Sequence, residues 1–219
     1  MNLRGLLISA ILLLALSISA FAQDEDDDDY KWRNFELNIV GGLSLPSGST
    51  SDWYDSLGAQ TGFNVGISSA YFLTNKLGIG AYFTYSRFGV DDATVENDLS
   101  HQLYDAGLYF KYAFTGESSF EPYVRLNAGV LFPKLATWVG DDKNQLRELS
   151  YDPALSLGLY LGILYYTSDY GGVYLEAGYH NDITDGIKGE YASEEMNFND
   201  NTNYIEVRAG ISVYFGPEE

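Results

Sequence analysis

The stretch QLYDAGLYFKYAF, residues 102–114, alternates between two kinds of side chain. Every second position is apolar or aromatic: Tyr104, Ala106, Leu108, Phe110, Tyr112 and Phe114. The positions between them include Asp105 and Lys111. A period of two predicts a β-strand with two different faces, because successive side chains of a strand point to opposite sides of the sheet. Which of these faces meets solvent has to be decided from the rest of the chain.

Seven other runs alternate in the same way, so the chain holds eight predicted strands. The other seven occupy about residues 35–44, 60–73, 77–86, 121–132, 155–165, 173–180 and 204–215. Most exceed the ~5–6 residues of an ordinary strand and match the ~9–11 residues that a tilted strand needs to cross a bilayer. The runs therefore predict membrane-crossing strands.

The connections between the runs are alternately short and long. The long ones cover about residues 45–59, 88–101, 133–151 and 181–203. An even number of strands with short turns on the periplasmic side and long loops outside is typical of an outer-membrane barrel. We therefore predict an all-β fold, an eight-stranded antiparallel up-and-down transmembrane β-barrel over residues 35–215. A ten-stranded barrel, with an extra hairpin at residues 186–203, is the alternative.

The charged residues of the runs decide which face points inward, because they all lie on the face opposite the apolar one. They are Glu36, Asp105, Lys111, Glu121, Arg125, Glu176, Glu206 and Arg208. A basic residue facing lipid costs ~2–4 kcal/mol near the bilayer midplane, so these charges belong in the lumen. This arrangement is the inverse of a soluble, lipocalin-like barrel, whose interior is apolar.

Side chains roughly fill the interior of an eight-stranded barrel, so we expect the lumenal charges to form an ion-paired network. A structural role for this network is favoured over a proton or ion path. Since the last strand must pair with the first, Glu206 or Arg208 should lie near Glu36 or Asn38. Four bulky residues on the inner face argue against an open channel: Tyr82, Tyr109, Tyr123 and Tyr160.

The N-terminus has the features of a secretory signal. An apolar run after Arg4 ends in Ala20-Phe21-Ala22, which predicts a cleaved signal peptide over residues 1–22. Residues 23–34 include six consecutive acids, at 24–29, and are predicted to be a disordered segment. Residues 216–219 form a short C-terminal tail. The chain has no cysteine, which excludes disulfides, and its formal charge of −19 makes nucleic acid a poor partner.

The last strand carries a family resemblance. RAGISVYF, residues 208–215, resembles the C-terminal insertion signal of small outer-membrane barrels, with Gly210, Val213 and Phe215 as its assembly residues. The chain from Phe35 to Phe215 is similar to barrels of the OmpA/OmpX type, in the outer membrane protein β-barrel domain family. This resemblance implies the outer membrane of a Gram-negative bacterium, recognition by the barrel-assembly machinery, and contact with outer-membrane lipid and lipopolysaccharide.

Two histidines are the candidates for catalysis. His101 and His180 lie at the ends of predicted strands, at the outer rim, with Ser100, Asp98, Asp182 and Asp185 as possible companions. Rim enzymes of outer-membrane barrels that cleave acyl chains or peptides place similar groups there. No motif fixes a nucleophile, so histidines that are hydrogen-bonded among polar rim residues are the favoured interpretation.

Acidic residues concentrate in the long loops, and their carboxylates suit calcium or magnesium, which also bridge lipopolysaccharide. The candidate metal ligands are Asp91, Asp92, Asp141, Asp142, Asp182 and Asp185. They do not match the EF-hand pattern, and no cofactor is predicted. The sequence favours a structural or surface-interaction protein whose acidic loops bind divalent cations or partners. A small gated pore and a rim-located hydrolase of lipid A or peptides remain the alternatives.

Overall fold

A computed structural model of the chain describes residues 34–47, 59–90, 100–114, 119–139, 145–168, 170–183, 187–191, 194–198 and 202–216. The predicted signal peptide, the acidic run after it and the last three residues lie outside these ranges. Eight long strands form the barrel: β1 (Phe35–Ser47), β2 (Gly62–Phe72), β3 (Leu77–Gly89), β4 (Ser100–Ala113), β5 (Phe120–Val139), β7 (Ala154–Ser168), β8 (Gly171–Ile183) and β11 (Thr202–Phe215).

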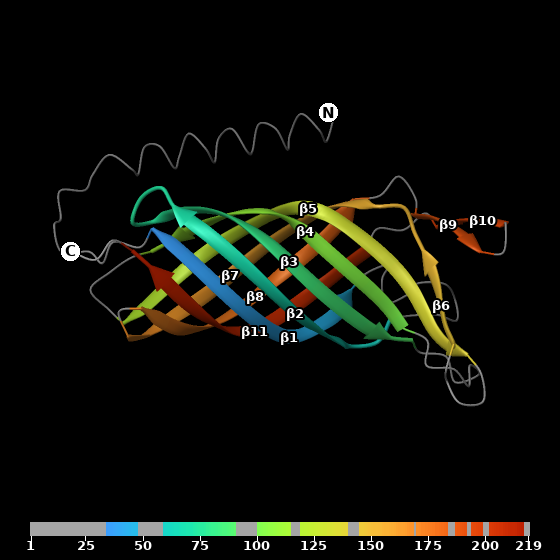
Figure 1. The fold of residues 1–219 in the computed structure, drawn as a ribbon, viewed down its shortest axis with the longest axis horizontal. Coiled ribbons are helices and arrows are strands. Elements are labelled where there is room, and N and C mark those ends of the chain that lie inside the picture. The colour runs from blue at the N-terminus through green and yellow to red at the C-terminus, as the bar shows by residue number, and fades with distance from the viewer. Residues whose placement is uncertain are drawn as a thin grey trace. The chain divides into compact units, whose positions relative to one another are not determined.

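The barrel closes through the pairing of its first and last strands (Figure 1). The register of β1 and β11 runs from Phe35 opposite Phe215 to Ser47 opposite Asn203. The other barrel strands pair antiparallel with their neighbours, so the order around the wall is β1-β2-β3-β4-β5-β7-β8-β11. Closure leaves no sheet edge inside the membrane, where unpaired backbone groups would be costly. The predicted eight-stranded barrel is confirmed.

Three further strands lie beyond the barrel wall, and they correct two expectations. β5 runs to Val139 and pairs with β6 (Gln145–Ser150), so much of the predicted loop 133–151 is a β-hairpin. β9 (Ile187–Tyr191) and β10 (Glu194–Phe198) form the extra hairpin that the ten-stranded alternative required. Their ladder joins only these two strands and does not enter the barrel sheet, so the ten-stranded barrel is wrong.

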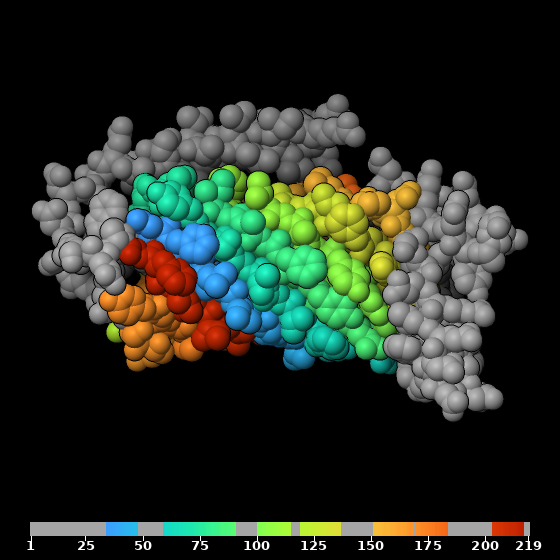
Figure 2. Space-filling model, in the orientation of Figure 1, coloured from blue at the N-terminus to red at the C-terminus, as the bar shows by residue number. Residues whose placement is uncertain are grey.

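The opening stretch shows how the two faces are used. Leu108 is 58% exposed and Phe110 is 52% exposed, whereas Asp105 and Lys111 are 2% and 4% exposed. The same alternation holds along β1, where Leu37 and Ile39 face outward and Glu36 and Asn38 face inward. Figure 2 shows the outer surface over β11 and β1 to β5. An apolar outer face this continuous requires hydrocarbon around it, as the sequence predicted.

Aromatic pairs sit on the outer face near the ends of the strands. Phe35 and Phe215, at the start of β1 and the end of β11, approach to 6.1 Å between ring centroids. Tyr85 and Tyr104, at the opposite end, approach to 5.1 Å. Two aromatic levels separated by an apolar band are the girdles of an outer-membrane barrel. No helix in the described part of the chain is long and apolar enough to span a bilayer.

Candidate functional site

The inside of the barrel holds the polar residues that the alternation directed inward. Each of the eight predicted lumenal charges is at most 5% exposed: Glu36, Asp105, Lys111, Glu121, Arg125, Glu176, Glu206 and Arg208. Buried charges are stable only when paired and hydrogen-bonded, so their partners determine what the lumen can do.

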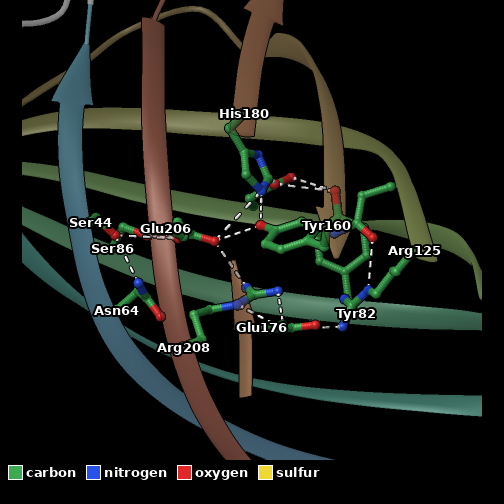
Figure 3. A network of polar contacts seen from close by, with 12 residues as sticks. Ser44, Asn64, Tyr82, Ser86, Arg125, Tyr160, Glu176, His180, Glu206 and Arg208 are labelled. Carbon is green, nitrogen blue, oxygen red and sulfur yellow. Dashed lines mark hydrogen bonds and ion pairs between the residues drawn. The ribbon is translucent and has the colours of Figure 1, made fainter. Parts of the chain in front are cut away.

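Arg208 is the centre of this network (Figure 3). It lies directly opposite Glu176 in the pairing of β11 with β8, and its Nε donates to Glu176 Oε1 at 2.9 Å. Its Nη1 lies 3.0 Å from Glu206 Oε2 on its own strand. Residues 206 and 208 share a face because the strand period is two. One guanidinium therefore neutralises two buried carboxylates.

Arg125 enters the network from β5. Its Nη1 lies 3.9 Å from Glu176 Oε1, and its Nε donates to Asn127 Oδ1 at 2.8 Å. The guanidinium lies 4.0 Å from the ring centroid of Tyr109 and 5.6 Å from those of Tyr82 and Tyr160. Cation–π contacts stabilise a charge that is withdrawn from water. The inward tyrosines thus serve both to fill the lumen and to hold Arg125.

A second ion pair lies nearer the start of β1 and corrects an expectation. Lys111 Nζ donates to both oxygens of Glu36, at 2.8 and 2.9 Å. The expectation that Glu206 or Arg208 lies near Glu36 or Asn38 is wrong. Antiparallel pairing sets Glu36 and Asn38 opposite Tyr214 and Ser212, whereas Arg208 is opposite Gly42. Ser212 takes the expected place and donates to Glu36 at 3.3 Å.

The space around these ion pairs is almost filled. A cavity of about 10 Å³ remains, which is barely enough for one water molecule. It is lined by Glu36, Asn38, Tyr109, Lys111, Tyr123, Arg125, Tyr174 and Glu176. Side chains from β1, β4, β5 and β8 thus meet across the lumen and close it at this level.

His180 and His101 lie inside the barrel rather than at an exposed rim, since each is only 2% exposed. His101 is the second residue of β4 and His180 lies three residues before the end of β8, so both lie near strand ends, as the sequence predicted. The ring of His180 stacks on Tyr204, with centroids 4.8 Å apart and an interplanar angle of 6°. Its Nε2 contacts the hydroxyl of Tyr160, which donates to Glu206 Oε2 at 2.5 Å. His180 is thereby joined to the central network.

The other nitrogen of His180 allows a test of the hydrolase alternative. His180 Nδ1 lies 3.4 Å from Ser156 Oγ and 3.7 Å from Asp105 Oδ2. Ser156 itself donates to Asp105 Oδ2 at 2.9 Å. In a catalytic triad the serine and the acid contact different ring nitrogens, so that the imidazole can pass a proton from one side while being held at the other. Here Ser156 and Asp105 both lie at Nδ1, whereas Glu206 Oε2 lies 3.6 Å from Nε2. All of these groups are buried inside the barrel.

Two of the predicted companions of the histidines, Ser100 and Asp182, belong to the described residues. Ser100 is buried, 3% exposed, and Asp182 is fully buried. Asp98 and Asp185 lie outside the described residues. The partners that His180 does have, Ser156 and Tyr160, were visible in the sequence as inward positions of one strand, but their proximity to His180 depends on the register of β7 and β8, which sets Gly158 opposite it.

Of the candidate metal ligands, only Asp182 belongs to the described residues. Asp91, Asp92, Asp141, Asp142 and Asp185 lie outside them. Within the described ranges, no three or more His, Asp or Glu side chains are grouped as a metal site would need. The assembly residues Gly210, Val213 and Phe215 lie on β11, where Val213 and Phe215 face outward and are 42% and 52% exposed.

Comparison with solved structures gives the same architecture. Neisserial surface protein A is 20% identical, with a TM-score of 0.57 over 83% of this chain and 97% of that one. OprG from Pseudomonas aeruginosa is 14% identical, with a TM-score of 0.52 over 86% of this chain and all of that one. A major outer membrane protein from Thermus thermophilus is 12% identical, with a TM-score of 0.52 over 83% of this chain and 99% of that one. These likenesses show the fold.

A comparison with curated protein sequences finds no significant match. The model of the outer membrane protein beta-barrel domain, in contrast, matches residues 8–152, which is more than half of the chain. The chain therefore belongs to the outer membrane protein beta-barrel domain family, and it is a small eight-stranded barrel of the Gram-negative outer membrane.

Proposed function

We propose that this barrel is a closed support that holds its extracellular segments at the cell surface, where they contact cations and partners outside the cell. The observation that carries the proposal is the filled lumen around Arg125 and Glu176, where a cavity of about 10 Å³ remains. Arg208 and Arg125 bind carboxylates from within the barrel, and tyrosine rings fill the space between them. A lumen that is this tightly filled favours a role at the outside of the barrel over transport through it.

The hairpin of β5 and β6 supports the display role. The β5 ladder leaves β4 after Ala136 and continues with β6 to Val139. A tilted strand needs ~9–11 residues to cross a bilayer, whereas β5 has 20. The excess extends from the end of the barrel opposite the start of β1, where β6 lies (Figure 1). A hydrogen-bonded ribbon of this kind can present side chains at a defined place.

In planar lipid bilayers, we expect the refolded protein to give no discrete current steps, because the ion-paired layer around Arg125 leaves no continuous water path. Heat-dependent gel mobility identifies the folded protein beforehand. The matched control is the variant with Tyr109→Ala and Tyr123→Ala, which removes two rings from the cavity wall and should raise the frequency of current steps. Regular steps from the unmodified protein would replace the display role with a pore.

Acidic segments outside the described residues are the proposed cation ligands. Calorimetric titration of the folded protein with calcium should give heat at millimolar concentrations, in the range of weak extracellular sites. The heat should fall when Asp91, Asp92, Asp141 and Asp142 are changed to Asn. A variant with the same change at Asp26, Asp27, Asp28 and Asp29 is the control with equal charge loss. If calcium gives no heat, cations are removed from the proposal.

Assembly and surroundings follow from membership of the family. We propose that the barrel-assembly machinery recognises β11 through Gly210, Val213 and Phe215, and that the outer face contacts membrane lipid and lipopolysaccharide. The outward side chains of Val213 and Phe215 support this, because an approaching protein can reach them from the lipid side. No cofactor is included in the proposal.

A further inference from the structure

Two basic residues break the apolar character of the outer face. Of the basic residues on the barrel strands, Lys111, Arg125 and Arg208 point into the lumen. Arg87 and Lys134 lie on the outward positions of β3 and β5 and are partly exposed. A charge on the lipid-facing side is costly near the bilayer midplane and becomes tolerable only near its boundary.

The strand register brings both residues into one row. Arg87 is opposite Gln102 in the pairing of β3 with β4, and Gln102 is opposite Lys134 in the pairing of β4 with β5. Adjacent strands lie ~4.8 Å apart, so the backbones of Arg87 and Lys134 are separated by roughly 10 Å. The row therefore presents the guanidinium of Arg87, the amide of Gln102 and the ammonium of Lys134 side by side on the outer face.

An aromatic layer lies directly below this row. Tyr85, Tyr104 and Phe132 are its cross-strand members, each two residues closer to the membrane centre than the row. The hydroxyl of Tyr104 donates to Gln102 at 3.1 Å, and Lys134 Nζ lies 5.6 Å from the Tyr104 ring centroid. The row is therefore continuous with an interfacial girdle, and below the girdle Phe83, at 44% exposed, faces lipid.

The depth of the row can be estimated along β3. From Leu77 to Arg87 the strand advances by roughly 33 Å at ~3.3 Å per residue. With a tilt of about 35–45°, this rise covers roughly 25 Å along the membrane normal, which is the height of the apolar band of such barrels. Leu77 follows the short turn at the end of the barrel where β1 begins and β11 ends, so Arg87 reaches the opposite, extracellular boundary.

We propose that Arg87, Gln102 and Lys134 form a binding site for the phosphate groups of a phosphorylated glycolipid of the outer leaflet. The acyl chains of this lipid lie against the aromatic layer and the apolar band, and its phosphates meet the row. Arg87 offers a planar fork of donors that suits a phosphate, and Lys134 adds a point charge. The occupant is a lipid because the row borders the lipid-facing surface.

The negative charge of the rest of the protein restricts binding of lipid phosphates to the row of Arg87, Gln102 and Lys134. The chain carries a formal charge of −19, and a surface of that sign repels anions. Two outward cations on alternate strands form a local exception at the level where lipid phosphates lie. This site deepens the proposed contact of the outer face with lipopolysaccharide and rests on it, but it does not depend on what the extracellular segments bind.

The test uses the full refolded chain in a neutral detergent, with bound lipid counted by native mass spectrometry. The probes are diphosphorylated lipid A and the same lipid with both phosphates removed. We expect the diphosphorylated form to bind at least about 10-fold more tightly, since a hydrogen bond to a charged group contributes ~1.5–3 kcal/mol. The preference should be lost in the variant with Arg87→Gln and Lys134→Gln, and it should weaken with salt.

Two variants sharpen the result. Lys76→Gln removes one positive charge in the turn at the opposite end of β3 and should leave the preference unchanged. Gln102→Lys adds a third cation to the row and should strengthen it. Inorganic phosphate at millimolar concentration should not displace the lipid. Equal binding of the two lipids, an unchanged preference in the double variant, or displacement by inorganic phosphate would each overturn the assignment.

Discussion

Replacing Arg208 with methionine is expected to destabilise the barrel by about 3–5 kcal/mol, the cost of removing one partner from a buried ion pair. Arg208 donates to Glu176 at 2.9 Å and lies 3.0 Å from Glu206. Without it, Glu176 keeps a hydrogen bond from the Tyr123 hydroxyl and the more distant Arg125, at 3.9 Å. Glu206 keeps hydrogen bonds from neutral hydroxyls. Methionine fills much of the volume of the arginine stem, so lost charge dominates the effect.

The measurement is urea-dependent unfolding of the protein in lipid vesicles, followed by gel mobility of unheated samples. Arg87→Met makes the same substitution on the outer face and should change the free energy of unfolding by no more than about 0.5 kcal/mol. Adding Glu206→Gln to Arg208→Met removes one of the stranded charges and should restore part of the loss. Equal effects of Arg208→Met and Arg87→Met would show that the lumenal pairs do not stabilise the barrel.

The strands were predictable inside the membrane and less so outside it. Within the bilayer each strand must show apolar side chains to lipid, so alternation marks residues such as 102–114 without ambiguity. Beyond the bilayer that requirement ends. Pro133 and Lys134 interrupt the pattern of β5, although the β5–β6 ladder continues for several more residues on backbone hydrogen bonds. The β5–β6 hairpin does not need an apolar outer face in water. Its sequence therefore lacks the alternation of a membrane strand and was predicted to be a loop.

The lumenal residues were predictable as a set but not as pairs. Strand parity directs Glu36 and Lys111 inward, yet it does not give their heights. Their contact joins β1 to β4, which are not neighbours in the wall, and it depends on the register of every strand between them. The partners of His180 could not be predicted either, because Asp105 reaches it across the lumen from β4 and this contact also depends on the register of the strands between them. The face on which a side chain lies follows from its position in its own strand. Its position along the barrel axis depends on the register of all the strands.

A Gly107→Val substitution is expected to cost about 1–3 kcal/mol or more, or to prevent closure, because it overpacks the narrowest contact between β4 and β5. Gly107 faces the lumen directly opposite Gly129. A Cβ on Gly107 would overlap two backbone atoms of β5, Ala128 O and Gly129 Cα, which cannot rotate away. A Cβ on Gly129 would meet the hydroxyl of Tyr82, which donates to Asp105 at 3.1 Å. The glycine pair thus makes room for Tyr82 to reach the acid.

Gly41→Val is the matched control, because Gly41 is also a mid-strand glycine but faces outward. The nearest atom to a Cβ there is Asn64 O at 3.7 Å, an ordinary contact, and the rest of the side chain would enter lipid. We expect this variant to fold with unchanged or slightly higher stability, since glycine weakens a strand interior. The comparison uses folded yield in vesicles and the urea midpoint. If both variants lose the same stability, strand propensity rather than the close approach of β4 and β5 determines the effect, and the packing argument for Tyr82 and Asp105 fails.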